Sequence, residues 1–411
     1  MHKPLRSRDV RASNENLVLS LIFQQGHASQ SSVVQQTGLK APTVFRIFSK
    51  LEQEGYIRSC TDTVPGDSAV VPAGGPGSSA TPLASGTSQT PAASTGSSER
   101  KGRRPNLYCV EASSAYAIGV DFSRLAAAVI VVNFANQVIH HRSVELSRSD
   151  DREAVLSAVE ELIETAIRES AVDPQAIVGI GLAAPGVVDT ATGKVIDYRR
   201  IEGLNGYSLR DHFEARFSMP VYVHNNTSVI AASAYHYGDA LEVDSLLTVL
   251  VRSGVGAALI TQGDIFLNGT ATALEVGRMT LSPDSVERVA QDAGTLEQTV
   301  AERPMLERLQ KHYAVAGWED AEEKLSPVEV SSALYRECLE LGTAIRNLHH
   351  LFHPEAILLV TRFPLLSHVL GDAIRSVLPE RTVIPTVYDP VHACYGATDI
   401  VFRRFFTGAR E

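Results

Sequence analysis

The sequence predicts an α/β protein in which a small helical N-terminal part precedes a larger part with two similar halves of alternating strands and helices. Two observations lead to this fold class. Apolar residues recur at helical spacing before residue 55, and short apolar runs typical of buried strands follow residue 105. With 411 residues, 44% of them hydrophobic, the chain can bury the cores of two to three domains of roughly 150 residues each.

The first two predicted helices lie close to the N-terminus. The first covers residues 14–25 and ends at Gly26. Its buried face is expected to consist of Leu17, Leu21 and Ile22. The second helix is expected to follow Ser29, whose hydroxyl can cap it, and to run through Thr37.

The third predicted helix, residues 43–54, follows a tight turn at Gly38. Pro42 stands just before it, where the start of a helix tolerates proline. Its inward face is expected to consist of Val44, Ile47, Phe48 and Leu51. Gly55 ends the helix before a strand at residues 56–60. Helix, helix, turn, helix, strand is the order of a winged helix-turn-helix.

In a winged helix-turn-helix the third helix, here starting near Ala41, enters the major groove of DNA. Four polar residues would then face outward and could contact phosphates or base edges. These predicted DNA-binding residues are Lys40, Thr43, Arg46 and Lys50. The predicted partner is double-stranded DNA. The alternative for the same pattern is a small helical bundle with a solvated basic face.

The charge distribution agrees with a DNA contact confined to the N-terminal part. The whole chain has a formal net charge of −10. Residues 1–104 carry 12 Lys and Arg against 7 Asp and Glu, a net +5, and the rest carries 25 against 40, a net −15. Binding to phosphates requires local rather than overall positive charge.

A segment of unusual composition separates the two parts. Residues 61–98 are rich in Pro, Gly, Ser, Thr and Ala and contain no aromatic residue, so they cannot bury enough apolar area to offset their ordering entropy. We therefore expect residues 61–103 to be a disordered linker or an extended wing tip. The winged helix would occupy residues 1–60, its wing would return at residues 104–110, and the larger domain would span residues 111–411.

The larger part shows a strand pattern that occurs twice. AYAIGVD and AAAVIVVNF predict a hairpin, residues 153–170 predict an amphipathic helix, and VGIGLAAPG predicts a buried strand that ends in a glycine turn. LLTVLV and GAALITQ repeat the strand pattern in the second half. The repetition indicates two similar lobes.

Several blocks of the chain resemble the ROK family (repressors, open reading frames, sugar kinases). They are GRRPNLYCVEASSAYAIGVD, VGIGLAAPGVVDTATGKVI, LNGYSLRDHFEARFSMPVYVHNNTSVIAASAYHYG, SGVGAALI, and LEVGRMT followed by GTLE. The N-terminal part resembles the winged helix of the family's repressor branch, such as the xylose and N-acetylglucosamine repressors. The resemblance implies a two-lobed actin-like (sugar kinase/ribonuclease H-like) domain with a cleft between its lobes, which would bind an effector and form oligomers.

Three departures from the kinases of that family predict that the chain is not an enzyme and has no catalytic residues. The family's Asp-x-Gly-x-Thr phosphate loop reads DFSRL here, at residues 121–125, so that side chains hinder the approach of a phosphate. Asn226 stands where the family has its catalytic Asp, and a neutral amide cannot accept the proton. Residues 361–363 read TRF in place of a glycine-rich nucleotide turn. Only a GxG remnant, Gly254 and Gly256, remains.

No metal or other cofactor is expected. The family's structural zinc is bound by one His and three Cys. The corresponding residues of this chain are Arg278, Arg288, Ala290 and Thr295. The four cysteines are far apart and are expected to be free thiols: Cys60, Cys109, Cys338 and Cys394.

The resemblance implies that a sugar-binding cleft persists without catalysis. The predicted effector-binding residues are Gly186, Asn225, Asn226, Glu275 and Glu297. Carboxylates and amides suit hydrogen bonding to a polyol. The alternative is that these residues only cap helices or pair with Arg278.

The sequence predicts a DNA-binding transcriptional regulator, a repressor, with a sugar or sugar derivative as effector. The alternative is a regulator of the same fold that no longer senses a small molecule and responds to a protein partner or acts constitutively. A single recognition helix contacts few base pairs, so a homodimer or tetramer on a palindromic operator is expected. A cytoplasmic location without membrane contact is expected, because residues 1–14 lack an apolar signal core and Asp121 and Arg124 interrupt the apolar stretch 115–132.

Overall fold

The computed structural model describes residues 7–60, 106–147, 149–238, 243–267, 269, 271, 274–281 and 294–407, with the backbone alone for residues 7–12. The predicted linker, residues 61–103, lies outside these residues. Contacts within the chain define two compact units, one of residues 18–110 and one of residues 1–17 and 111–411. In the described part of the chain, no helix is both long and apolar enough to cross a membrane.

The smaller unit contains three helices and a three-stranded sheet. In chain order its elements are α1 (Ser7–Gln25, which continues from the other unit), β1 (His27–Ser29), α2 (Gln30–Thr37), α3 (Ala41–Gln53), β2 (Ile57–Cys60) and β3 (Leu107–Val110). The sheet order is β1-β3-β2 with antiparallel pairs, so that the strand after the linker lies between the two strands that precede it. The short β1 strand was not predicted.

Local signals explain the helix boundaries of this unit. Ser29 caps α2 through a reciprocal capping box with Ser32. Gly38 ends α2 in the left-handed conformation, at φ 68°, which costs glycine little. Pro42 lies in the first turn of α3, and the buried face of that helix is the predicted one: Val44, Ile47, Phe48 and Leu51. Phe48 packs edge-on against Tyr108 of β3, with ring centroids 5.0 Å apart.

Of the residues predicted for the buried face of α1, Ile22 is confirmed and Leu17 and Leu21 were wrong. Leu17 is exposed over 43% of its surface and Leu21 is only half-buried. The buried face consists of Ile22 together with Val18, Leu19 and Phe23. Consecutive helix residues are separated by 100°, so a shift of one position is enough to exchange a buried residue for an exposed one.

The larger unit begins with a lobe whose five-stranded sheet has the order β10-β7-β4-β5-β6. Its strands are β4 (Tyr116–Phe122), β5 (Ala126–Asn133), β6 (Val138–Glu145), β7 (Ile177–Ala184) and β10 (Val221–Asn225), with a separate β8 (Val187–Asp189) and β9 (Lys194–Asp197) ribbon. Its helices are α4 (Arg152–Ser170), α5 (Leu209–Phe217) and α6 (Asn226–Tyr237), with short 3₁₀ turns η1 (Ala112–Ser114) and η2 (Pro174–Ala176).

The second lobe has a five-stranded sheet of order β13-β12-β11-β14-β15. Its strands are β11 (Ser245–Val251), β12 (Val255–Thr261), β13 (Asp264–Ile265), β14 (Ala356–Thr361) and β15 (Thr382–Val387). Its helices are η3 (Val276–Arg278), α8 (Leu296–Val300), α9 (Glu302–Gln310), α10 (Trp318–Lys324), α11 (Pro327–Ala333), α12 (Tyr335–Phe352) and α13 (Pro364–Val377). The last helix, α14 (Pro390–Thr407), returns to the first lobe.

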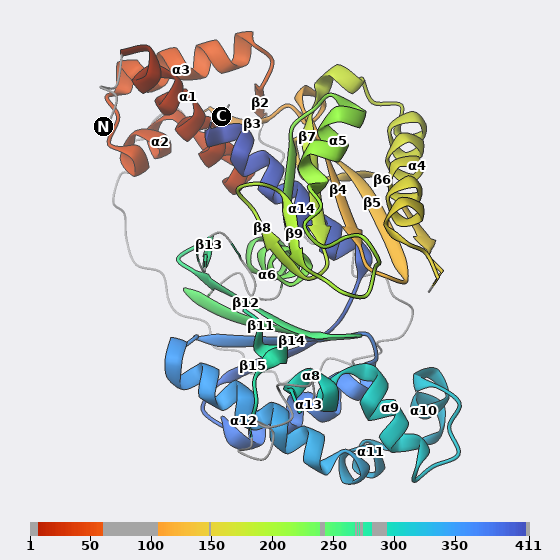
Figure 1. Cartoon of the computed structure of the whole chain (residues 1–411). Coiled ribbons are helices and arrows are strands. Elements are labelled where there is room, and N and C mark those ends of the chain that lie inside the picture. Colours follow the sequence, from red (N-terminus) through yellow and green to blue (C-terminus); the bar gives the residue numbers. More distant parts are fainter. Residues whose placement is uncertain are drawn as a thin grey trace, which may run out of the picture. The chain divides into compact units, whose positions relative to one another are not determined.

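The two sheets share one plan, which confirms the predicted α/β fold with two similar lobes. In the first sheet β4 pairs antiparallel with β5 and parallel with β7. In the second, β11 pairs antiparallel with β12 and parallel with β14. Helices α6 and α14 lie between the sheets in Figure 1 and pack against each other. A Cβ atom at Gly181 of β7 would overlap the backbone of Ala397, so α14 lies directly on the first sheet.

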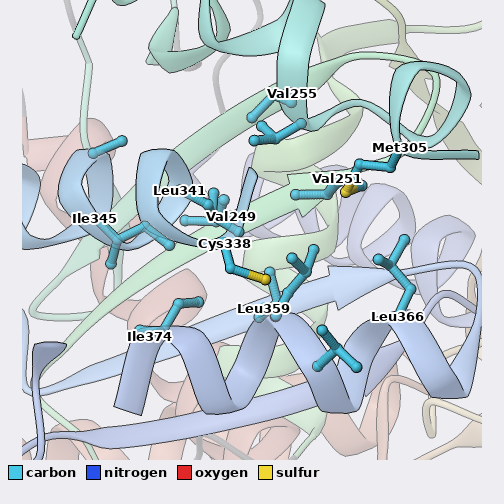
Figure 2. Packing of buried hydrophobic residues seen from close by; sticks show 14 of the residues in the cluster. Val249, Val251, Val255, Met305, Cys338, Leu341, Ile345, Leu359, Leu366 and Ile374 are labelled. Atoms are coloured by element: carbon cyan, nitrogen blue, oxygen red, sulfur yellow. The ribbon is translucent and has the colours of Figure 1, made fainter. Parts of the chain in front are cut away.

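The largest apolar core lies in the second lobe. Figure 2 shows Val249 and Leu359 of the central strands packed between α12 and α13. Leu341, Ile345, Leu366 and Ile374 supply the helix side of this core and are fully buried apart from at most 1% of their surface. This packing holds β11 and β12 in place, and β11 ends and β12 begins at the cavity described below.

Candidate functional site

The larger unit contains a cavity of about 490 Å³ between its two lobes. The carboxyl ends of the parallel strands β7, β10 and β11 meet there, as is usual for ligand clefts in α/β proteins. The turn between β11 and β12, the segment after β9, η3 and the start of α8 complete the lining. All five predicted effector-binding residues line this cavity: Gly186, Asn225, Asn226, Glu275 and Glu297.

Asn225 is engaged by the backbone of its own lobe. Its amide nitrogen Nδ2 donates to the carbonyl oxygen of Gly186 at 2.6 Å. Its oxygen Oδ1 accepts from the backbone N–H of Thr227 at 2.8 Å and thereby caps α6. Gly186 itself has φ 81°, and a side chain there would collide with Tyr198. Both residues therefore shape the wall of the cavity, and helix capping, the alternative considered above, is present at Asn225.

Glu297 of α8 connects the two lobes. Its Oε1 atom accepts a hydrogen bond from Nη2 of Arg200, which follows β9 in the first lobe. Its Oε2 atom accepts from the backbone N–H of Val255 at 3.1 Å. Arg200 also donates through Nη1 to the carbonyl oxygen of Ser253 in the second lobe. The Glu297 carboxylate is thus held by the second lobe and paired with a cation from the first.

Glu275 and Arg278 form a second connection across the cleft. Nε of Arg278 lies 3.0 Å from Oε2 of Glu275, and its Nη2 donates to Oδ2 of Asp197 at the end of β9. Burial raises the pKa of Glu275, and the Arg278 guanidinium opposes that rise. Glu275 therefore pairs with Arg278 in this structure, as the alternative to a sugar-binding role predicted.

The segment at residues 121–125 that corresponds to the family's phosphate loop contacts side chains of the second lobe. Asp121 at the end of β4 is 3% exposed and accepts a hydrogen bond from the hydroxyl of Tyr388. The guanidinium of Arg252 lies over the Tyr388 ring, 3.9 Å from its centroid. Burial raises the pKa of Asp121, with partial compensation from Arg252. Ser123 donates to the carbonyl oxygen of Ala126 at 3.3 Å and closes the turn after the strand.

The segment predicted to replace a nucleotide turn is also filled. Thr361 is fully buried and donates to the carbonyl oxygen of Phe363 at 3.0 Å. Phe363 stacks on Trp318 with ring centroids 5.5 Å apart. Arg362 lies 3.7 Å from the carboxylate of Glu302. A stacked aromatic pair and an ion pair therefore fill the space next to the carboxyl end of β14.

The residues at the zinc positions do not fit a zinc ion. Arg278 is paired with carboxylates and Thr295 precedes α8, and neither side chain is a zinc ligand. Arg288 and Ala290 lie outside the described residues. Within residues 7–60, 106–238, 243–281 and 294–407, apart from the short gaps, no group of three or more His, Cys, Asp or Glu could hold a metal. All four cysteines are free thiols.

The predicted DNA-binding residues lie on or next to α3 in the smaller unit. Lys40, Arg46 and Lys50 are exposed and Thr43 is half-buried. Lys50 also lies 3.7 Å from Glu54, one helical turn further along. Phe45 of the same helix is also exposed, over 60% of its surface. Phe45 is not among the predicted DNA-binding residues, because only polar side chains were expected to contact DNA.

Comparisons with known proteins agree with both units. Residues 117–393 match the ROK family, and residues 13–58 match a winged helix-turn-helix DNA-binding family. A xylose repressor of Caldicellulosiruptor bescii is 25% identical over 305 residues, covering 70% of this chain and 76% of the repressor. The DNA-binding transcriptional dual regulator NagC of Escherichia coli K12 is 23% identical over 422 residues, covering 97% of this chain and 94% of NagC.

Solved structures show the same fold. A ROK family transcriptional regulator described as a homologue of the E. coli MLC protein superposes with a TM-score of 0.72 at 16% identity, covering 97% of each chain. A ROK family glucokinase from Streptomyces griseus, in complex with glucose and AMPPNP, superposes with a TM-score of 0.58 at 19% identity, covering 70% of this chain and 99% of the kinase. The second comparison covers a smaller share of this chain than the first.

Proposed function

This chain belongs to the ROK family and is a transcriptional regulator with a DNA-binding winged helix-turn-helix, and we propose that it is a repressor whose catalytically inactive cleft binds a sugar effector. The observation that carries the proposal is the pairing of a DNA-binding module with a polar cleft whose catalytic base position is occupied by Asn226.

The DNA-binding part of the proposal rests on the exposed face of α3. Lys40, Arg46 and Lys50 supply positive charge beside an amphipathic helix of 13 residues whose other face is buried. A helix of this kind fits the major groove, where arginine can contact guanine in a bidentate manner and lysine neutralises phosphates. Phe45, the exposed residue before Arg46 in the helix, offers an apolar surface suited to the methyl group of thymine.

The absence of kinase activity is supported by three neighbouring features. Asn226 cannot act as a base. Tyr388 and Arg252 cover Asp121, and Phe363 and Trp318 pack at the β14 end. Phosphoryl transfer depends on positioning of the nucleotide and on stabilisation of the charge on the transferred phosphate. The side chains named here fill the regions in which the nucleotide and its phosphates would have to bind.

The cleft can couple ligand binding to a change in the arrangement of the lobes. Two ion pairs, Arg200–Glu297 and Arg278–Asp197, join the first lobe to the second. A polyol that binds Glu275 and Glu297 competes with the arginines for the same carboxylate oxygens. Such a ligand has different affinities for the paired and unpaired arrangements, which is the requirement for shifting a conformational equilibrium.

A homodimer or dimer-based tetramer on a palindromic operator is part of the proposal, because each chain contributes one recognition helix. Light scattering with and without operator DNA tests this point. A monodisperse monomer under both conditions contradicts it.

The main test is capture of genomic DNA fragments by the purified protein, followed by titration of sugars against the protein–DNA complex. We expect a palindromic site next to sugar-utilisation genes and release of DNA by a sugar or sugar derivative. DNA binding that no sugar alters would favour the alternative regulator without small-molecule sensing. Failure to retain any sequence-specific DNA would refute the DNA-binding function itself.

A further inference from the structure

Among the described residues that line the cleft, positive side chains outnumber negative ones. Its lining includes four arginines and three carboxylates. The arginines are Arg199, Arg200, Arg252 and Arg278, and the carboxylates are Asp197, Glu275 and Glu297. A neutral sugar needs hydrogen-bond donors and acceptors but no excess of charge.

Three of the arginines are already paired with these carboxylates. Arg199 lies 3.7 Å from Asp197, Arg200 pairs with Glu297, and Arg278 pairs with Asp197 and Glu275. Arg252 is different. Among the described residues, its guanidinium makes no hydrogen bond or ion pair, and it lies at the carboxyl end of β11 beside the turn to β12.

The position of Arg252 is set by aromatic packing. Its guanidinium lies over the ring of Tyr388, and the hydroxyl of Tyr388 is held by Asp121. Stacking uses the face of the guanidinium plane, whereas the N–H donors lie in that plane. The contact therefore orients the group and keeps its donors available for a bidentate acceptor.

Two acids that interact with Arg252 have pKa values raised by burial. Asp121 and Glu302 both interact electrostatically with Arg252. Burial raises the pKa of Asp121, and it raises the pKa of Glu302 to about 7, so Glu302 is partly protonated at neutral pH. Glu302 also faces Arg362 at 3.7 Å. Because Glu302 is partly protonated at neutral pH, it offsets the charge of the partly buried Arg252 guanidinium only in part, and this favours an added anion.

A second guanidinium lies in the same region. Arg252, Arg200 and Arg124 all act on the buried phenol of Tyr198, together with the single carboxylate of Glu297. Arg200 is also bound to the carbonyl oxygen of Ser253, the residue that follows Arg252 in the chain. Positive charge from both lobes thus converges beside the β11–β12 turn.

We propose that the cleft binds a sugar that carries an anionic group, a phosphate or a carboxylate, and that Arg252 with Arg200 holds this group. The sugar hydroxyls are then bound by Glu275 and Asn226, which also line the cavity. Arginine matches both anions because its planar donors form parallel hydrogen bonds with two oxygens. This inference rests on the proposed function, namely that the cleft binds a sugar effector.

The test uses the full-length protein and matched probes in thermal-shift assays and calorimetry at equal ionic strength. Glucose and N-acetylglucosamine are compared with their 6-phosphates, and glucose also with glucuronate. We expect an anionic probe to bind at least tenfold more tightly than its neutral parent, with an advantage that falls as salt is raised. Preference for a 6-phosphate or for glucuronate then identifies which anion is recognised.

Arg252→Gln should weaken binding of the preferred anionic probe by about tenfold to a hundredfold, the range for loss of a charge-assisted hydrogen bond. The matched control is Arg303→Gln, which removes a guanidinium that is 85% exposed on α9 and pairs with Glu307. The control should bind the probe like the unmodified protein. If Arg252→Gln does not fold, the comparison of neutral and anionic probes on the unmodified protein decides the question.

The outcomes separate this inference from the proposed function. Equal or tighter binding of the neutral parents would refute the anion site and leave a sugar-binding cleft. Unchanged affinity of a folded Arg252→Gln variant would also refute the assignment. If neither neutral nor anionic sugars bind, the proposed sugar effector fails together with the anion site.

Discussion

Replacing Glu275 with Ala separates a ligand-binding role from a structural one. In this structure the Glu275 carboxylate lies 3.0 Å from Nε of Arg278, and the two side chains are 44% and 60% exposed. An ion pair this exposed contributes about 0.2 to 1 kcal/mol to folding. A hydrogen bond from a sugar hydroxyl to a carboxylate in the cleft contributes about 1.5 to 3 kcal/mol to binding.

The two roles therefore predict different magnitudes. If Glu275 binds the effector, Glu275→Ala lowers effector affinity by about tenfold to a hundredfold and lowers the melting temperature by no more than about 2 to 4 °C. DNA affinity without effector should not change, because Glu275 belongs to the unit that does not contain α3.

The assay titrates the sugar or sugar phosphate selected in the thermal-shift screen against the variant bound to operator DNA and compares the melting temperatures. Glu307→Ala on α9 is the matched control, since it removes a carboxylate that is 54% exposed and ion-paired with Arg303. A variant with lowered stability and a normal effector response would show that Glu275 serves only to hold Arg278 and would refute its place in the binding site.

Three further predictions concern DNA binding, catalysis and pH. Arg46→Ala should weaken operator binding by about 1 to 3 kcal/mol if Arg46 contacts a base, whereas Lys50→Ala should weaken the binding of specific and non-specific DNA to the same extent. Unchanged footprints in both variants would show that α3 is not the recognition helix. Asn226→Asp should not create hexose phosphorylation, measured as ADP release with glucose, because Asp121 stays covered by Tyr388; sugar-dependent turnover in the unmodified protein would contradict this. Since the folded pKa of Glu302 is raised from 4.5 to about 7, its contribution to stability is fully present below pH 4.5 and is lost as pH rises through about 7. The free energy of unfolding, measured with denaturant, should therefore fall between pH 6 and pH 8 by an amount on the order of 1 kcal/mol that Glu302→Gln removes. The same fall in the variant would count against a buried Glu302.

Local signals in the sequence were sufficient for most of the fold. The capping box at Ser29, the turn at Gly38 and the amphipathic face of α3 involve residues within one or two helical turns, so their pattern is visible in the sequence. The hairpins of the two lobes were predicted for the same reason, because their strands are adjacent in the chain. The face of α1 was misassigned because Leu17 and Val18 are both apolar and only packing distinguishes them. The strand β1 was missed because its three residues depend on pairing with β3, which follows the linker.

The sequence by itself determined which residues could line the cleft, since resemblance to one family places Gly186, Asn225 and Glu297 at its wall. Only the tertiary structure decided what those side chains contact. Arg200 and Glu297 are 97 positions apart and Asp121 and Tyr388 are 267 apart, so no periodicity or local propensity reveals either pair. Such pairs form because chain folding brings the ends of distant strands to one edge of each sheet, where a charged group that leaves water must find a partner from the opposite lobe.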